Sequence, residues 1–217
     1  MENRVIKFGL ILSMCLLVTG CQTALPKNQL IKEGKMRYII ADQEQNPFVT
    51  LIQNPGGLII SPNDEVKQMT VYFDVYHQDK IVKHEEVGKV FADDLFKLKG
   101  TLVWGETANN KLNDSDEQSD DSSYMNPLSV AFVTEESSIN FGIPDMSRYQ
   151  YNSSSNFSLS DEMKQLPTNQ PVMLAMWSKG ESFTTFDNSL EYFKKENLKN
   201  EASYFLYVVF SDKVIDD

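Results

Sequence analysis

The chain has 217 residues, a formal net charge of −11 at pH 7 and two cysteines. This length can bury a core without cross-links, and the negative charge opposes contact with phosphate backbones, so we expect no nucleic-acid partner. Both cysteines, Cys15 and Cys21, lie near the N-terminus, which excludes a disulfide framework or a zinc–thiolate site in the rest of the chain. We expect no cofactor.

The first 20 residues have the pattern of a secretion signal. Arg4 and Lys7 precede an apolar run over residues 8–18, and the polar Thr19 ends that run. A membrane-spanning helix needs about 20 apolar residues, which is more than this run provides. The sequence therefore predicts a signal peptide over residues 1–20. Because Arg4 and Lys7 against Glu2 give that segment a charge of +1, its removal leaves a charge of −12.

The segment Leu17-Val18-Thr19-Gly20-Cys21 resembles the lipobox of bacterial lipoproteins. The resemblance implies cleavage after Gly20 and attachment of a diacylglyceryl group to the thiol of Cys21. Two or more acyl chains hold a protein stably on a bilayer. We therefore expect a lipid-anchored protein on the cell membrane, facing away from the cytoplasm, and the Lys-, Asn- and Ile-rich composition favours a Gram-positive cell.

Residues 21–35 are polar, contain Pro26, and predict a tether to a β-rich domain over residues 36–217. Strands are expected over residues 37–41 and 48–53. The second is ended by Asn54-Pro55-Gly56-Gly57, and a short strand follows over residues 58–61.

The clearest hairpin joins residues 69–77 to residues 81–90 around Gln78-Asp79-Lys80. The first arm alternates apolar and polar residues with a period of two, which is typical of a strand. The second arm is rich in Lys and Glu, which predicts an edge strand. A further strand is expected around Leu102-Val103-Trp104.

Residues 109–123 carry almost no apolar side chain and predict a loop or linker, which would allow two β units within 36–217. The loop begins like a calcium site, with Asp114 and Asp116 in the first and third positions. Gln118 and Ser119 then break the pattern, so no metal site is expected.

Later strands are expected over residues 128–134, 139–143, 172–178 and 203–210, the last of them central. A polar Ser/Asn loop follows Tyr151, and short helices are expected from Ser160 and over residues 187–197. The fold class is therefore mainly β: an antiparallel sandwich or a partly open barrel, immunoglobulin-like in architecture, with one or two short helices.

Two histidines, His77 and His84, flank the predicted hairpin turn and are the side chains that could transfer protons at neutral pH. Asp74 or Glu86 could complete a metal or acid–base site with them. Solvated surface histidines are the favoured interpretation, because a functional site needs groups that converge in a cleft.

Tyr149 and Tyr151 share one strand face and could form a stacking platform for a sugar or a peptide, although packing is the favoured interpretation. Trp104 and Trp177 are expected in the core. The acidic doublets Asp93-Asp94, Glu85-Glu86 and Glu135-Glu136 are not catalytic pairs, because neighbours on a strand point to opposite faces.

The leading hypothesis for function is a membrane-anchored, non-catalytic binding or interaction module. Its partners would be the membrane, through the lipid at Cys21, and an unknown envelope protein or ligand. The alternatives are a small-ligand or cation-binding lipoprotein that serves a transporter and, less favoured, an envelope hydrolase that uses His77 or His84. No catalytic residue is assigned.

Overall fold

The computed structural model describes residues 31–40, 52–107, 128–141, 151–156, 162–180 and 200–215. The predicted signal peptide with Gly20, the lipidation residue Cys21 and the acidic loop over 109–123 lie outside this part of the chain. Residues from Ile31 to Asp217 form one compact unit. Among the described residues, no helix combines the length and apolar character needed to cross a membrane.

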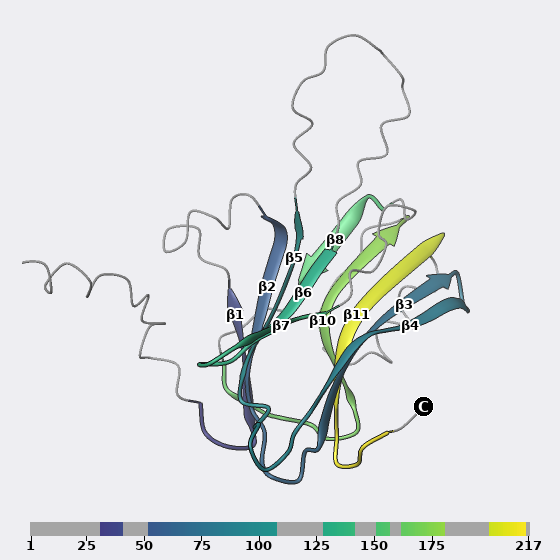
Figure 1. Cartoon of the computed structure of the whole chain (residues 1–217). Helices are drawn as coiled ribbons and strands as arrows, with labels where there is room; N and C mark the ends of the chain where they lie inside the picture. The colour runs from purple at the N-terminus through teal and green to yellow at the C-terminus, as the bar shows by residue number, and fades with distance from the viewer. Residues whose placement is uncertain are drawn as a thin grey trace, which may run out of the picture. The chain divides into compact units, whose positions relative to one another are not determined.

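The described residues form two antiparallel sheets, one of six strands and one of five (Figure 1). The first sheet has the order β7-β6-β5-β2-β1-β9 and the second the order β4-β3-β11-β10-β8. The strands are β1 (Lys35–Ile40), β2 (Ile52–Ser61), β3 (Gln68–His77), β4 (Lys80–Phe91), β5 (Gly100–Thr107), β6 (Leu128–Val133), β7 (Ser138–Asn140), β8 (Ser153–Asn156), β9 (Lys164–Gln165), β10 (Pro171–Lys179) and β11 (Ala202–Ser211).

The core lies between the two sheets and confirms the predicted mainly β sandwich. Leu58 and Phe132 from the first sheet are fully buried in one cluster with Phe73 and Trp177 from the second. The hydroxyl of Tyr38 on β1 donates a 2.6 Å hydrogen bond to the carbonyl oxygen of Met173 on β10. Neither sheet closes on itself, so the architecture is a sandwich and not a closed barrel.

The segment Asn54–Gly57 lies inside β2, so the expectation that it ends a strand was wrong. A register shift between Gln53 and Gly56 accommodates the proline within the strand. A Cβ atom on Gly56 would lie 2.3 Å from the ring of Trp104. The glycine is therefore needed for close approach of the indole rather than for a turn.

Strands from both sides of the 109–123 segment share both sheets. In the first sheet β6 pairs with β5, and in the second β11 pairs with β3. The two-unit alternative therefore finds no support in the strand pairing. The described folded part also begins earlier than predicted, since Ile31 is buried and the amide of Gly34 donates to the carbonyl of Ser61 at 2.6 Å.

Two local expectations were wrong. The Ser/Asn segment after Tyr151 contains β8, which pairs with β10 through its backbone and so needs no apolar side chains. Lys164 and Gln165 form β9 against β1, where a helix from Ser160 was expected. Pairing with β1 prevailed over a weak local helix signal close to Pro167. The other predicted helix, residues 187–197, lies outside the described residues.

The predicted edge and central strands are both confirmed. β11 lies between β3 and β10, and almost all of its side chains are buried. β4 is an edge strand with two register shifts, which leave Val82 and Val87 without a partner residue on β3. Such bulges, together with the charged side chains of β4, discourage pairing with another strand.

Candidate functional site

A cleft of about 560 Å³ opens at the end of the sandwich where β2 leads into β3 and β4 leads into β5. The segment before β1 forms a third wall. The lining residues are Ile31, Glu33, Ser61, Pro62, Asn63, Asp64, Val66, Lys67, Ala92, Asp93, Asp94, Lys97, Leu98 and Lys99. This volume is in the range of pockets that bind small organic ligands.

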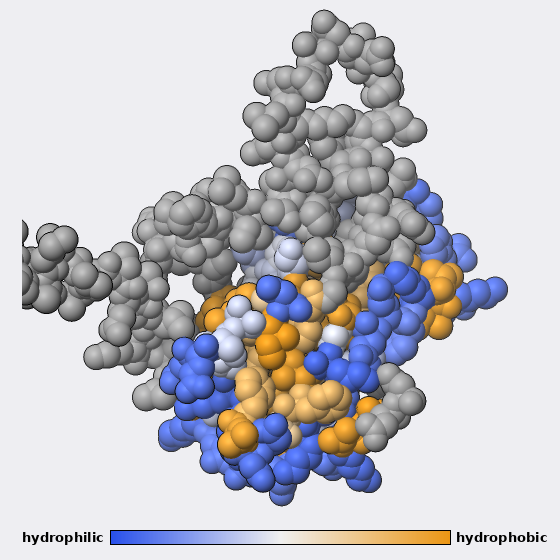
Figure 2. Space-filling view, in the orientation of Figure 1, coloured by the Kyte–Doolittle hydropathy of each residue, from blue (hydrophilic) through white to orange (hydrophobic). Residues whose placement is uncertain are grey.

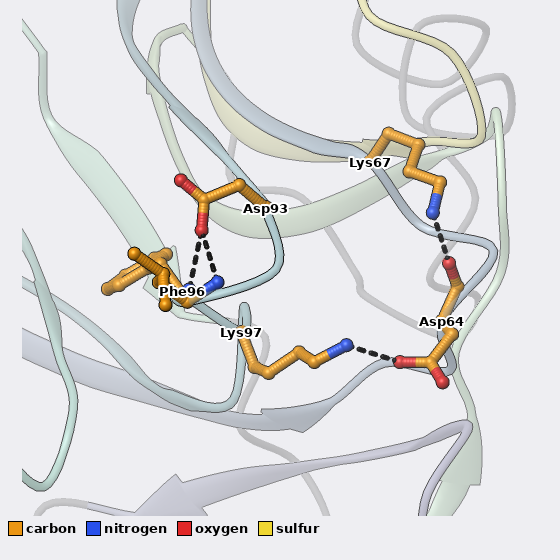
Figure 3. A network of polar contacts seen from close by, with 6 residues as sticks. Asp64, Lys67, Asp93, Phe96 and Lys97 are labelled. Atoms are coloured by element: carbon orange, nitrogen blue, oxygen red, sulfur yellow. Dashed lines mark hydrogen bonds and ion pairs between the residues drawn. The ribbon is translucent and has the colours of Figure 1, made fainter.

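Backbone hydrogen bonds hold the walls of the cleft in place. The amide of Lys67 donates to the carbonyl of Ser211 at 2.8 Å, and the Lys67 carbonyl accepts from the amide of Ala92 at 2.8 Å. The carboxylate of Asp93 accepts from the amides of Leu95 and Phe96 at 2.7 and 2.6 Å (Figure 3). Asp93 thus shapes the β4–β5 turn, as Asx turns do.

The charged side chains at the rim are linked through Asp64. Lys97 donates to the Asp64 carboxylate at 2.8 Å, and Lys67 donates to the Asp64 carbonyl at 2.7 Å, so the two lysines approach one residue (Figure 3). The lining contains four carboxylates and three ammonium groups. The cleft is therefore a site of fixed, nearly balanced charge.

Contact between Asp64 and Lys97 moves the pKa values of both groups away from neutral pH. Hydrogen bonding to Lys97, and then its charge, lowers the pKa of Asp64. Hydrogen bonding to Asp64, and then its charge, raises the pKa of Lys97, with smaller contributions from Asp94 and Glu33. An efficient general acid or base has a pKa near the working pH. Neither Asp64 nor Lys97 therefore has the pKa of an efficient general acid or base at neutral pH.

The floor of the cleft is apolar. Ile31, Val66 and Leu98 line it and are almost fully buried, with 6, 3 and 2 % of their surface exposed. In Figure 2 this end of the sandwich is mostly hydrophilic, with small hydrophobic patches between the hydrophilic residues. The cleft thus combines an apolar floor with a rim that is more highly charged than that of most small-molecule pockets.

The two histidines are not brought together. His84 Nδ1 lies 2.6 Å from Asp74 Oδ1, and Tyr207 donates to the other oxygen of Asp74 at 3.3 Å. His77 lies three residues after Asp74 on β3, so its side chain points to the opposite face. Asp74, one of the two acids considered beside the histidines, therefore contacts His84.

An aromatic row crosses three strands at this place. The ring of Tyr72 stacks on His84, with centroids 5.0 Å apart, and on Tyr207, with centroids 5.5 Å apart. Cross-strand aromatic pairs of this kind stabilise a sheet. His84 thus adds side-chain contacts to the backbone pairing of β4 with β3. Glu86, the other acid considered beside the histidines, forms an ion pair with Lys89 at 3.3 Å.

Tyr151 is not an exposed platform residue, because its hydroxyl donates to the carboxylate of Glu106. Trp177 Nε1 donates to the other oxygen of Glu106 at 2.6 Å. Glu106 and both predicted core tryptophans, Trp104 and Trp177, are buried. The other predicted platform residue, Tyr149, lies outside the described residues.

Only some of the residues that line the cleft could be identified from the sequence. The doublet Asp93-Asp94 was recognised, and its members differ in role because Asp93 binds the turn backbone whereas Asp94 lines the cleft. Asp64 and this doublet line the same cleft but belong to two different loops, about 30 residues apart in the sequence. Spacing alone could not reveal that contact. Groups of three or more potential metal ligands are absent from the described residues.

Comparisons with protein-family models, with curated proteins and with solved structures find no match for this chain.

Proposed function

We propose that the protein is a membrane-anchored extracytoplasmic lipoprotein that acts as a non-catalytic binding module, and that the cleft between the β2–β3 and β4–β5 loops is its binding surface. The observation that carries this proposal is the combination of an apolar floor with a rim of fixed charges. The resemblance of residues 17–21 to a lipobox supports the anchor.

A small-ligand lipoprotein that serves a transporter is the second candidate, and the volume of the cleft favours it. An envelope hydrolase that uses His77 or His84 has less support, because neither histidine lines the cleft. A thermal-shift screen with metabolites would favour the second candidate if one compound raised the melting temperature.

The direct test is site-specific photocrosslinking in cells. A photoreactive residue at Asp94 samples the cleft, and the same residue at Asp79, in the exposed turn at the far end of β3, is the matched control. We expect a discrete crosslinked partner from position 94 only, and its loss in the Cys21→Ala chain. Equal capture from both positions, or capture that is unaffected by Cys21→Ala, would contradict the proposal.

A further inference from the structure

Exposed apolar side chains gather at the end of the sandwich that carries the β2–β3 and β4–β5 loops (Figure 1). Seven large hydrophobic side chains are exposed among the described residues, and four of them belong to this end: Phe91, Leu95, Val214 and Ile215. A single exposed apolar residue is ordinary on a protein surface, whereas a group of them at one place indicates an interaction surface. We call these four residues the apolar end.

Backbone pairing brings the members of the apolar end near one another. Gln68 pairs with Phe91 on one side and with Ser211 on the other, at the ends of β4 and β11. The side-chain oxygen of Gln68 accepts a 2.8 Å hydrogen bond from the amide of Ile215. Phe91 and the residues that follow β11 therefore surround Gln68, and Leu95 lies in the loop into which Phe91 leads.

Leu95 is held outward by its own loop. Its side chain is 97 % exposed, whereas the ring of the next residue, Phe96, packs edge-on against the buried Phe132 with centroids 6.5 Å apart. The carboxylate of Asp93 accepts from the amides of both Leu95 and Phe96, which fixes the turn. The loop thus presents a leucine outward in a defined position, where it adds nothing to the core.

The chain enters the domain at the same end. Ile31 lines the cleft together with both loops, and the amide of Gly34 donates to the carbonyl of Ser61 at the end of β2. Cys21 precedes Ile31 by ten residues, which span at most about 35 Å. β3 alone has ten residues, a length of about 33 Å, so the turn at its far end could meet a membrane only if those residues were fully extended. A lipid on Cys21 would therefore hold the apolar end nearest the bilayer.

The charges at this end favour an apolar contact with lipid over an electrostatic one. Lys67 and Lys97 are both bonded to Asp64, and the cleft lining holds more carboxylates than ammonium groups. The negative charge of the chain adds repulsion from anionic headgroups. Attraction to a membrane must therefore come from apolar side chains, and the charged Asp94 beside Leu95 limits their insertion to the headgroup region.

From the exposure of Leu95, its fixed turn and the entry point of the chain, we infer that the apolar end rests on the membrane surface, with its side chains inserted among the lipid headgroups. This inference rests on the proposed function, because it needs the anchor at Cys21. It also narrows the class of partner, since the cleft opens at the same end. A partner that occupies the cleft must itself lie in or at the membrane.

The test measures the depth of single spin labels on the lipidated full chain in phosphatidylcholine vesicles. Cys15 leaves with the proposed signal peptide and Cys21 carries the lipid, so an introduced cysteine is the only free thiol. Dissolved oxygen concentrates in the bilayer, whereas a nickel chelate stays in water. On vesicles, a label at Leu95→Cys should gain oxygen collisions and lose most of its nickel collisions. Ile81→Cys, an exposed apolar position beside the far turn, is the matched control and should stay accessible to nickel.

A second variant tests whether Leu95 holds the rest of the apolar end in the lipid. With the label at Val214→Cys, the substitution Leu95→Asp should raise nickel collisions, because a carboxylate resists entry into the headgroup region. Ile81→Asp should leave the same label unchanged. Both substituted side chains are exposed, so neither change removes core packing.

Three results would overturn the inference, and they bear differently on the proposed function. If the chain floats with the vesicles but the label at Leu95 is as accessible to nickel as the label at Ile81, the inference fails and the anchor stands. Loss of both oxygen and nickel collisions at Leu95 would show that a second copy of the protein covers it instead of lipid. A chain that does not float with the vesicles would overturn the proposed anchor, and the inference with it.

Discussion

The indole nitrogen of Trp177 on β10 donates a 2.6 Å hydrogen bond to the carboxylate of Glu106 on β5, and this bond joins the two sheets of the sandwich. Glu106 has no exposed surface, and the hydroxyl of Tyr151 donates to its second oxygen. A buried carboxylate is tolerated in a protein interior when donors satisfy it. The Glu106 site is therefore a polar link between the sheets, in addition to the hydrogen bond from Tyr38 to Met173.

Glu106→Leu should lower the free energy of unfolding by about 2–4 kcal/mol, because it leaves the donors of Trp177 and Tyr151 without an acceptor. Glu106→Gln keeps one acceptor oxygen and should cost about half as much. Urea denaturation measures both values, and the exposed Glu135→Gln is the control. If Glu106→Leu and Glu106→Gln lowered the free energy of unfolding equally, the loss would not come from donors left without an acceptor.

The two histidines provide a matched pair of variants. His84→Ala removes the contact with Asp74 and the stacking on Tyr72, and should destabilise the protein by about 1–2 kcal/mol. His77→Ala changes an exposed residue at the end of β3 and should stay within about 0.5 kcal/mol of the natural chain. Chemical denaturation distinguishes them. If His77→Ala proved the costlier variant, His84 would not attach β4 to the sheet.

Alkaline pH should weaken the fold through two tyrosines. Burial raises the pKa of Tyr38, and burial followed by the charge of Asp74 raises the pKa of Tyr207, both from an ordinary value of 10.0. Because the folded pKa lies above the unfolded one, this contribution to stability is complete below pH 10 and is lost as pH rises further.

Denaturation midpoints between pH 8 and pH 11.5 measure this loss, and tyrosinate absorbance should rise together with unfolding rather than before it. Tyr207→Phe removes one of the two groups and should reduce the loss of stability above pH 10. Ionisation of all tyrosines at pH 10 in a folded protein would contradict the burial of these hydroxyl groups.

Gly88→Ala should lower the free energy of unfolding by about 1–3 kcal/mol, since a Cβ atom at Gly88 would lie 2.4 Å from the ring of Phe141. Differential scanning calorimetry measures the change. Adding Phe141→Leu to Gly88→Ala should recover part of the loss, because the smaller side chain makes room. A double variant that is worse than the sum of the two single variants would refute the steric explanation.

The sequence predicted the strands whose apolar pattern is strong, and these include the β3–β4 hairpin, β10 and the central β11. It failed where backbone pairing decided the structure. Ser153–Asn156 carries polar side chains only, yet it forms β8 because the edge of β10 offers backbone partners. The polar link at Glu106 was missed for a related reason, since Tyr151 and Trp177 reach it from distant parts of the chain.

The bulges and charged side chains of the edge strand β4 affect how copies of the protein meet on a crowded membrane surface. A lipid anchor of the proposed kind confines many copies of a protein to two dimensions, where collisions between identical sheets are frequent. A regular, apolar edge strand would then promote lateral polymerisation. The unpaired residues Val82 and Val87 interrupt the hydrogen-bonding register of β4, so neighbouring copies can meet edge to edge without joining into a continuous sheet.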